Sequence, residues 1–104
     1  MASPASDDQI QTWLGDHGAW SYDAERKALE RIFKFADFVE AFGFMTVVAI
    51  RAQELNHHPD WSNSYDTVDV ELTTHDADAV TERDFELAAF MDEWAAKHGA
   101  KDAD

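Results

Sequence analysis

The chain changes from one hydrophobic period to another at Pro59, and this change constrains the fold more than any other feature of the sequence. Apolar side chains recur at helical spacing over residues 38–56, whereas over residues 67–74 they alternate strictly with polar ones. Because proline disfavours helical backbone angles in the residue before it, the helix is expected to stop near Asn56 or His57. A long helix followed by a half-buried strand is therefore the centre of the predicted fold.

The remaining segments add elements on both sides of this pair. Ser6 and Gln9 have the spacing of a capping box, as have Thr81 and Asp84, and Asp37 can cap the long helix. In chain order the sequence predicts a helix over residues 6–16, strands over 19–22 and 28–36, a helix over 38–56, strands over 61–65 and 67–74, a loop over 76–80 and a last helix from Thr81.

This order predicts a single α+β domain over residues 1–104, with one antiparallel sheet that carries its helices on one face. Residues 1–5 and 99–104 carry no clear pattern and are expected to be frayed. Apolar side chains fill about 160° of the surface of helix 38–56, which is more than one sheet needs. The surplus suggests packing against another subunit, although a helix deeply embedded in a monomer would show the same pattern.

The composition excludes several classes of protein. The chain has 22 acidic residues against 8 basic ones and a formal net charge of −14, so it repels phosphate backbones and nucleic-acid binding is not expected. It has no cysteine, which excludes disulfides and thiolate metal sites. No signal peptide or membrane span is recognisable, so a soluble cytoplasmic protein without membrane contact is expected. The scarcity of lysine beside so many acids resembles proteins adapted to a salt-rich cytoplasm.

Three histidines lie on the two sides of the Pro59 turn. His57 and His58 precede it, and His75 follows the alternating strand. Histidine exchanges protons near neutral pH, so this group could supply both an acid and a base to one reaction. Two other interpretations remain open, because a histidine in a last helical turn is also favoured by the helix dipole, and three imidazoles can hold zinc.

Several separated motifs agree in order and spacing with the signature of one known family. They are Ile32-Phe-Lys-Phe-Ala-Asp-Phe-Val-Glu-Ala-Phe-Gly-Phe-Met-Thr-Val-Val-Ala, His57-His58-Pro59, Trp61, Tyr65, Thr74-His75 and Thr81-Glu-Arg-Asp84. Through these motifs the chain resembles the pterin-4a-carbinolamine dehydratases over most of its length. The resemblance is weakest at the N-terminal end.

The resemblance implies a four-stranded antiparallel sheet with helices on one face, in agreement with the order of elements above. It also implies homodimers or homotetramers built through sheet edges and helices. The family removes water from a 4a-hydroxytetrahydropterin and gives the quinonoid dihydropterin, in tetrahydropterin recycling or in a pathway linked to molybdopterin. The departing hydroxyl needs a proton and N5 must lose one, so no metal, nucleotide or redox cofactor is expected.

The resemblance also implies roles for individual residues. His57 and His75 are the expected acid–base pair, while His58 holds the pterin ring and assists. Asp84 would orient a histidine or stabilise its charge, as carboxylates commonly do. The substrate-binding residues that the resemblance implies are His58, Pro59, Trp61, Gln53 and Thr74.

Gln53 departs from the family pattern, because the position four residues before His57 is usually acidic. A neutral amide can orient a ring through a hydrogen bond, but it stabilises the charged form of that ring less than a carboxylate does. Glu54 lies about 100° further round the helix and is a poor substitute. The departure puts the rate and the accepted pterin in question more than the class of reaction.

A second class of function is an interaction protein. Some animal members resemble this chain and also act as dimerisation cofactors for a homeodomain transcription factor. The alternative function is therefore a non-catalytic module that binds a pterin or another protein, in which the histidines and Asp84 serve the fold alone.

Overall fold

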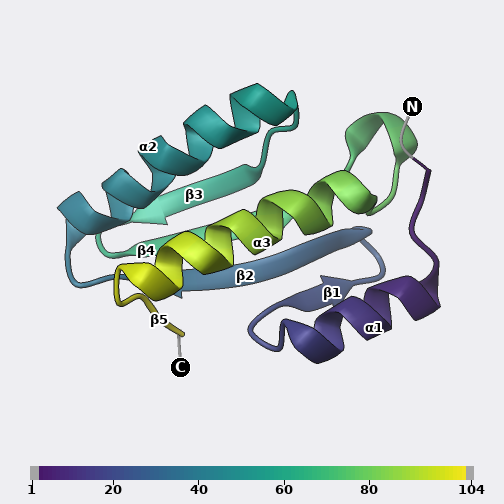
Figure 1. Ribbon diagram of the computed structural model, residues 1–104, viewed down its shortest axis with the longest axis horizontal. Helices are drawn as coiled ribbons and strands as arrows, with labels where there is room; N and C mark the ends of the chain where they lie inside the picture. The colour runs from purple at the N-terminus through teal and green to yellow at the C-terminus, as the bar shows by residue number, and fades with distance from the viewer. Residues whose placement is uncertain (1–2, 103–104) are drawn as a thin grey trace.

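The computed structural model describes residues 3–102, which fold as one sheet with helices on one side (Figure 1). The helices and strands follow the predicted order, with a 3₁₀ turn and a short last strand in addition, and the α+β prediction is confirmed. In chain order the elements are α1 (Asp7–Asp16), β1 (Ser21–Asp23), β2 (Ala28–Lys34), α2 (Phe38–Leu55), β3 (Asp60–Ser64), β4 (Thr67–Leu72), the 3₁₀ turn η1 (His75–Ala77), α3 (Glu82–Lys97) and β5 (Lys101–Asp102).

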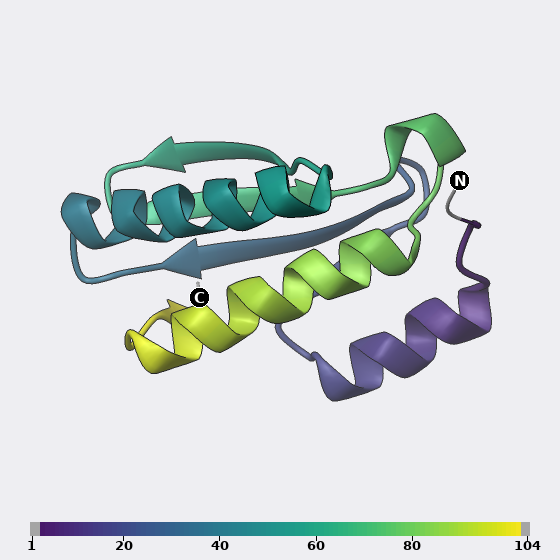
Figure 2. The ribbon, with the colours of Figure 1, turned by 45° about the horizontal axis from the view of Figure 1, so that its top comes forward.

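The strands of the sheet pair antiparallel in the order β1-β2-β4-β3. The four-stranded antiparallel sheet implied by the resemblance is therefore present. β5 extends it, because Phe33 of β2 pairs with Val68 of β4 on one side and with Asp102 of β5 on the other. The three α-helices lie on the same face of the sheet, which leaves the opposite face open (Figures 1 and 2).

The core fills the space between the sheet and its helices. On β4, Val68, Val70 and Leu72 are fully buried. On β2, Leu29 and Phe33 are also fully buried, in the register that places Leu29 opposite Leu72 and Phe33 opposite Val68. The strict alternation in the sequence thus produces one dry face and one wet face of the sheet.

Arg31 interrupts the apolar side of β2. The strand tolerates this charge because a carboxylate on α3 pairs with it. The Nη1 atom of Arg31 donates to Oδ1 of Asp92 at 2.5 Å, and its guanidinium lies 4.1 Å from the centroid of the Phe33 ring. The indole N–H of Trp20 donates to the same carboxylate oxygen at 2.8 Å. The charge on the core face is therefore paired, which offsets the cost of partly burying it.

α2 begins and ends at residues that cap it. Asp37 accepts a hydrogen bond from the backbone of the first turn at 2.8 Å. At the other end Asn56 adopts the left-handed conformation, with φ 51° and ψ 43°. The backbone N–H of His57 then donates to the carbonyl of Ala52 at 3.0 Å, which completes a common helix ending. The helix therefore stops close to its predicted end, with the adjacent histidines directly after it.

The sequence predicts frayed ends over residues 1–5 and 99–104, and the structure is more ordered than that. The N–H of Ala5 donates to the carbonyl of Val80 at 2.8 Å. At the other end the chain turns at Gly99, which has φ 72°, and β5 pairs with β2. Both pairings join segments far apart in the sequence, so local patterns do not reveal them. For the two outermost residues at either end, which lie outside the described part of the chain, fraying stays a prediction.

β2 and β4 each end two residues before their predicted ends. After β4, the N–H of Thr74 donates to the carbonyl of Ala79 at 2.9 Å, and η1 lies within the loop that this bond closes. The turn moves His75 off the strand, which decides what its side chain can contact.

α2 buries only part of its apolar surface in the single chain. Its buried residues are Ala41, Phe44, Val48 and Ala52. Large apolar side chains on the rest of its surface stay between 47 % and 77 % exposed, and these are Phe38, Val39, Phe42 and Ile50. Of these, Phe38 and Phe42 belong to the apolar arc predicted from the sequence, whereas Val39 and Ile50 lie outside it, so only part of the uncovered apolar surface was predicted.

Candidate active site

The end of α2 and the first turn of α3 bring His57 and Asp84 together. Nε2 of His57 donates to Oδ1 of Asp84 at 2.5 Å, although 27 positions separate the two residues. His57 is 6 % exposed, and Asp84 is fully buried. A buried carboxylate therefore holds the first of the two adjacent histidines.

Asp84 accepts two further hydrogen bonds through Oδ2. The backbone N–H of Thr81 donates to it at 2.9 Å and the hydroxyl of Thr74 at 2.8 Å. Because Thr74 uses its one hydroxyl proton in this way, the hydroxyl of Thr81 must donate to Oγ1 of Thr74, at 2.6 Å. The oxygen of Thr81 in turn accepts from the backbone of Arg83 at 3.3 Å. Every donor in the network points toward the carboxylate, the arrangement that an ionised aspartate requires.

Thr81 and Asp84 also form the predicted capping box of α3. The side chain of Thr81 caps the helix, and the side chain of Asp84 returns a bond to the backbone of Thr81. Thr74, which the resemblance places among the substrate-binding residues, is 1 % exposed, and its hydroxyl is committed to Asp84. One carboxylate thus starts a helix and orients a histidine.

The bond to Asp84 selects one tautomer of His57. A carboxylate can only accept, so Nε2 carries a proton and Nδ1 is the unprotonated nitrogen of the neutral ring. In the described part of the chain Nδ1 has no hydrogen-bond partner, and it is not among the fully buried unpaired atoms. It can therefore accept a proton, and Asp84 can stabilise the imidazolium that results.

His58 has a different partner. Its Nε2 atom lies 3.1 Å from Oε1 of Gln53, and both side chains are exposed. The amide oxygen accepts from a ring N–H, so Gln53 can orient this ring. Gln53, the residue that differs from the family pattern, therefore contacts His58, while the carboxylate of Asp84 contacts His57.

His75 opens η1, where its Nε2 atom lies 2.9 Å from Oδ2 of Asp60, the first residue of β3. The side chain of His75 is 70 % exposed and that of Asp60 is 52 % exposed. The structure thus gives His57 and His75 separate carboxylates, and no hydrogen bond joins the two rings within residues 3–102. The sequence motifs do not single out Asp60, because its contact lies 15 positions away and depends on η1.

Trp61 lines two hollows at this end of the molecule. It is half-buried on β3 and borders an apolar groove of about 670 Å³ along α2, beside Gln53. It also borders a hollow of about 480 Å³ with Asp60 and His75. Pro59 is half-buried in the connection that leads from α2 into β3. The end of α2, the start of β3 and η1 lie at the same end of the sheet in both views, and this corner is the candidate site (Figures 1 and 2).

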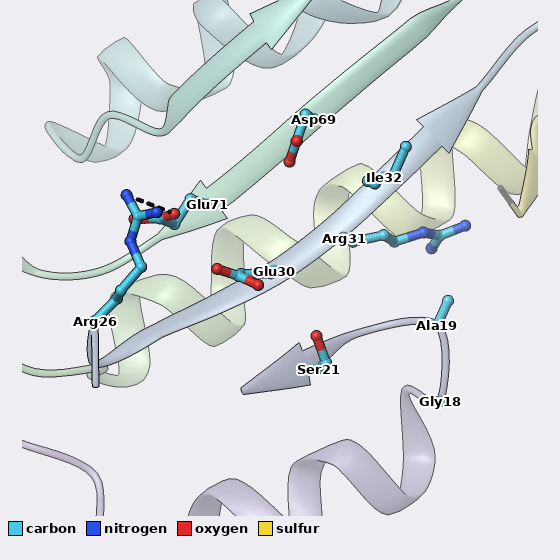
Figure 3. Close-up of a pocket in the computed structure, with 9 residues that line it drawn as sticks. All are labelled: Gly18, Ala19, Ser21, Arg26, Glu30, Arg31, Ile32, Asp69 and Glu71. Carbon is cyan, nitrogen blue, oxygen red and sulfur yellow. Dashed lines mark ion pairs between the residues drawn. The ribbon is translucent and has the colours of Figure 1, made fainter. Parts of the chain in front are cut away.

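Acidic side chains cross the open face of the sheet next to this corner. Glu30, Glu71 and Asp60 lie opposite one another on β2, β4 and β3. Figure 3 shows Glu30 and Glu71 in a hollow on this face with Arg26, which pairs with Glu71 at 3.2 Å. Burial raises the pKa of Glu30, and the charges of Asp23 and Glu71 add to the effect. None of the expected site residues lines that hollow.

Within residues 3–102, no three His, Asp or Glu side chains are placed so that they could hold a metal ion, and the three histidines of the candidate site form no such group. In the same part of the chain, every helix is too short or too polar to cross a membrane.

Comparison with known proteins gives a consistent result. The family described as pterin 4 alpha carbinolamine dehydratase matches residues 3–94. A Burkholderia orbicola protein named "Putative pterin-4-alpha-carbinolamine dehydratase" is 54 % identical over 96 residues, which cover 92 % of this chain and 94 % of that protein. A Burkholderia cenocepacia protein of the same name is 61 % identical with the same coverage. The crystal structure of a "transcriptional coactivator/pterin dehydratase" from Brucella melitensis superposes with a TM-score of 0.84 at 40 % identity, over 88 % of this chain and 97 % of that one.

Proposed function

The chain belongs to the pterin 4 alpha carbinolamine dehydratase family, and from this membership we propose that it eliminates water from a 4a-hydroxytetrahydropterin to give the quinonoid dihydropterin. The observation that carries the proposal is the buried pair of His57 and Asp84, with a bond of 2.5 Å. A histidine held in this way is a base whose charged form already has a partner. The second histidine–carboxylate pair, at His75, supplies an acid in the same corner of the fold.

In the proposed reaction, Nδ1 of His57 takes the proton from N5 of the substrate. The electron pair of the N5–H bond forms the double bond between N5 and C4a, and the bond from C4a to the hydroxyl oxygen breaks. The departing hydroxyl takes a proton from His75 and leaves as water. Acid–base help of this kind contributes about 10²–10⁴-fold to a rate.

The other residues of the corner would hold the substrate. His58, oriented by Gln53, can hold the pterin ring, and the indole of Trp61 can wall the site. Thr74 would act on the substrate through Asp84, because its hydroxyl is used there. We place the reaction in the cytoplasm, in tetrahydropterin recycling or a related pterin or molybdopterin pathway.

A rate measurement on the purified chain tests the proposed function. The native protein should accelerate the dehydration of synthetic 4a-hydroxytetrahydropterin by about 10²–10⁴-fold over the spontaneous reaction. The rate should rise with KCl concentration, because salt screens the repulsion within a chain of net charge −14. A folded native chain that gives no acceleration at any salt concentration would refute the dehydratase and favour an interaction module.

We further propose that copies of this chain cover the outer face of α2 in a homodimer or homotetramer. Exposed apolar side chains gather on this face, where Val39 is 77 % exposed and Ile50 is 61 % exposed. The apolar groove beside Gln53 continues the same surface. A monomer seldom leaves so much apolar surface in one place uncovered.

Ile50→Glu should dissociate this assembly. The substitution costs the single chain little, because Ile50 is mostly exposed there, but it places a charge in the proposed interface. Light scattering coupled to size exclusion should give a multiple of the chain mass for the native protein and a smaller mass for Ile50→Glu. Ala96→Glu, at an exposed position of α3, is the control and should keep the native mass. A native protein that already has the mass of one chain would end the proposal.

A further inference from the structure

We propose that Asp60 is a positioning residue for His75, a role that neither the motifs nor the resemblance assigns to it. Oδ2 of Asp60 lies 2.9 Å from Nε2 of His75, so the contact joins the first residue of β3 to the first residue of η1. The effect of Asp60 on a reaction rate rests on the proposed function, in which His75 is the acid. The effect of Asp60 on the orientation and protonated nitrogen of the His75 ring does not depend on the proposed function.

Asp60 lies on a rigid element, and His75 does not. Asp60 pairs with Glu71 in the ladder between β3 and β4, and Pro59 restricts the backbone directly before it. His75 opens a 3₁₀ turn of 3 residues that has no side-chain cap, and its ring is mostly exposed. Among the described residues, Asp60 is the one hydrogen-bond partner of this ring. The carboxylate therefore decides how the imidazole lies.

The bond also decides which nitrogen of His75 gives up a proton. The carboxylate of Asp60 accepts from Nε2, so Nε2 keeps its proton whether the ring is charged or neutral. The proton available to the departing hydroxyl is then the one on Nδ1. After the transfer, the neutral ring is already in the form that Asp60 holds. An asparagine could accept from a protonated Nε2 or donate to a bare one, so it would select neither form.

Other charges near His75 must be separated from Asp60 by a control. Glu71, Asp69 and Arg26 line the same hollow. Glu71 lies opposite Asp60 in the sheet register and pairs with Arg26 at 3.2 Å. Glu71→Gln removes one negative charge from this hollow and leaves the hydrogen bond to His75 in place. It is therefore the matched control for Asp60→Asn.

Asp60→Asn should lower kcat for dehydration by about tenfold to a hundredfold, the range found when the hydrogen-bond partner that orients a metal-bound histidine is removed. KM should change less, because the ring form matters in the transition state more than in binding. Asp60→Glu should restore most of the loss, and Glu71→Gln should keep kcat close to the native value. When His75 is already replaced by glutamine, Asp60→Asn should have no further effect, since the two residues act through one contact.

Nitrogen NMR of the His75 ring gives a readout that does not depend on activity. In the native protein the neutral ring should be mainly in the form with the proton on Nε2, and Asp60→Asn should give a mixture of both forms. An unchanged ring form, or an equal loss of kcat in Glu71→Gln, would overturn the proposal. If the native chain proves to have no dehydratase activity, the proposed function fails, and the ring form in Asp60→Asn still decides whether Asp60 positions His75.

Discussion

Replacing His57 with glutamine should lower kcat for dehydration by about 10²–10⁴-fold while the chain stays folded. The amide of glutamine can still donate to Oδ1 of Asp84, which the native ring reaches at 2.5 Å, so the buried carboxylate keeps a partner. The amide has no nitrogen that can take a proton from N5 of the substrate near neutral pH. The substitution therefore removes the base and retains the bond that the fold uses.

His98→Gln is the control for His57→Gln. His98 lies at the end of α3, where its ring stacks on Trp94 with 3.9 Å between centroids, and it belongs to neither histidine–carboxylate pair. It should keep native kcat, and circular dichroism should show both variants folded. If folded His57→Gln retains native kcat, His57 is not the base, and the buried pair serves the fold alone.

Asp84→Ala should have the largest effect on stability, lowering the free energy of unfolding by about 3–5 kcal/mol. The substitution leaves the hydroxyl of Thr74, the N–H of Thr81 and Nε2 of His57 without their acceptor at a fully buried position. It also breaks the capping box that starts α3. Urea denaturation at one fixed protein concentration measures the change, because unfolding of an oligomer depends on concentration.

Two further variants separate the roles of Asp84. Asp84→Asn keeps the shape of the side chain, but its amide NH2 group replaces one carboxylate oxygen and then faces another hydrogen-bond donor. This mismatch should lower the free energy of unfolding by about 1–3 kcal/mol. The substitution should also lower kcat by about tenfold to a hundredfold, because the amide no longer holds His57 in one form. Glu82→Gln removes an exposed charge from the same helical turn and should cost less than about 1 kcal/mol. If Asp84→Ala is no less stable than Glu82→Gln, the buried network does not contribute as described.

Elements with a strong local pattern follow the sequence closely. α2 ends at Leu55 because Asn56 turns the chain and Pro59 cannot continue a helix, and both signals lie within a few residues. The start of α3 also depends on a local signal, because Thr81 and Asp84, three positions apart, form the capping box that begins the helix. The two-residue alternation of β4 likewise predicts which of its side chains are buried.

The contacts of the candidate site depend on the tertiary structure to different degrees. The family motifs indicate that Asp84 serves a histidine, but they do not indicate that Thr74 gives its hydroxyl to Asp84 and is buried. They also do not indicate the contact of Asp60 with His75, because η1 moves His75 away from the position that a longer β4 would give it. Such contacts arise only when separate elements are packed against one another.

The sequence by itself determined the hydrophobic periods of the helices and strands, the residues that cap the helices, and the order of the elements. Each of these depends on interactions between residues close along the chain. The tertiary structure alone decided how each histidine is held, since His57 meets Asp84 across 27 positions and His75 meets Asp60 across 15. It also decided that Arg31 belongs on the core face, because Asp92, 61 positions away on α3, pairs with it. The sheet register and the packing of α2 and α3 set these distances, and no local pattern in the chain encodes them.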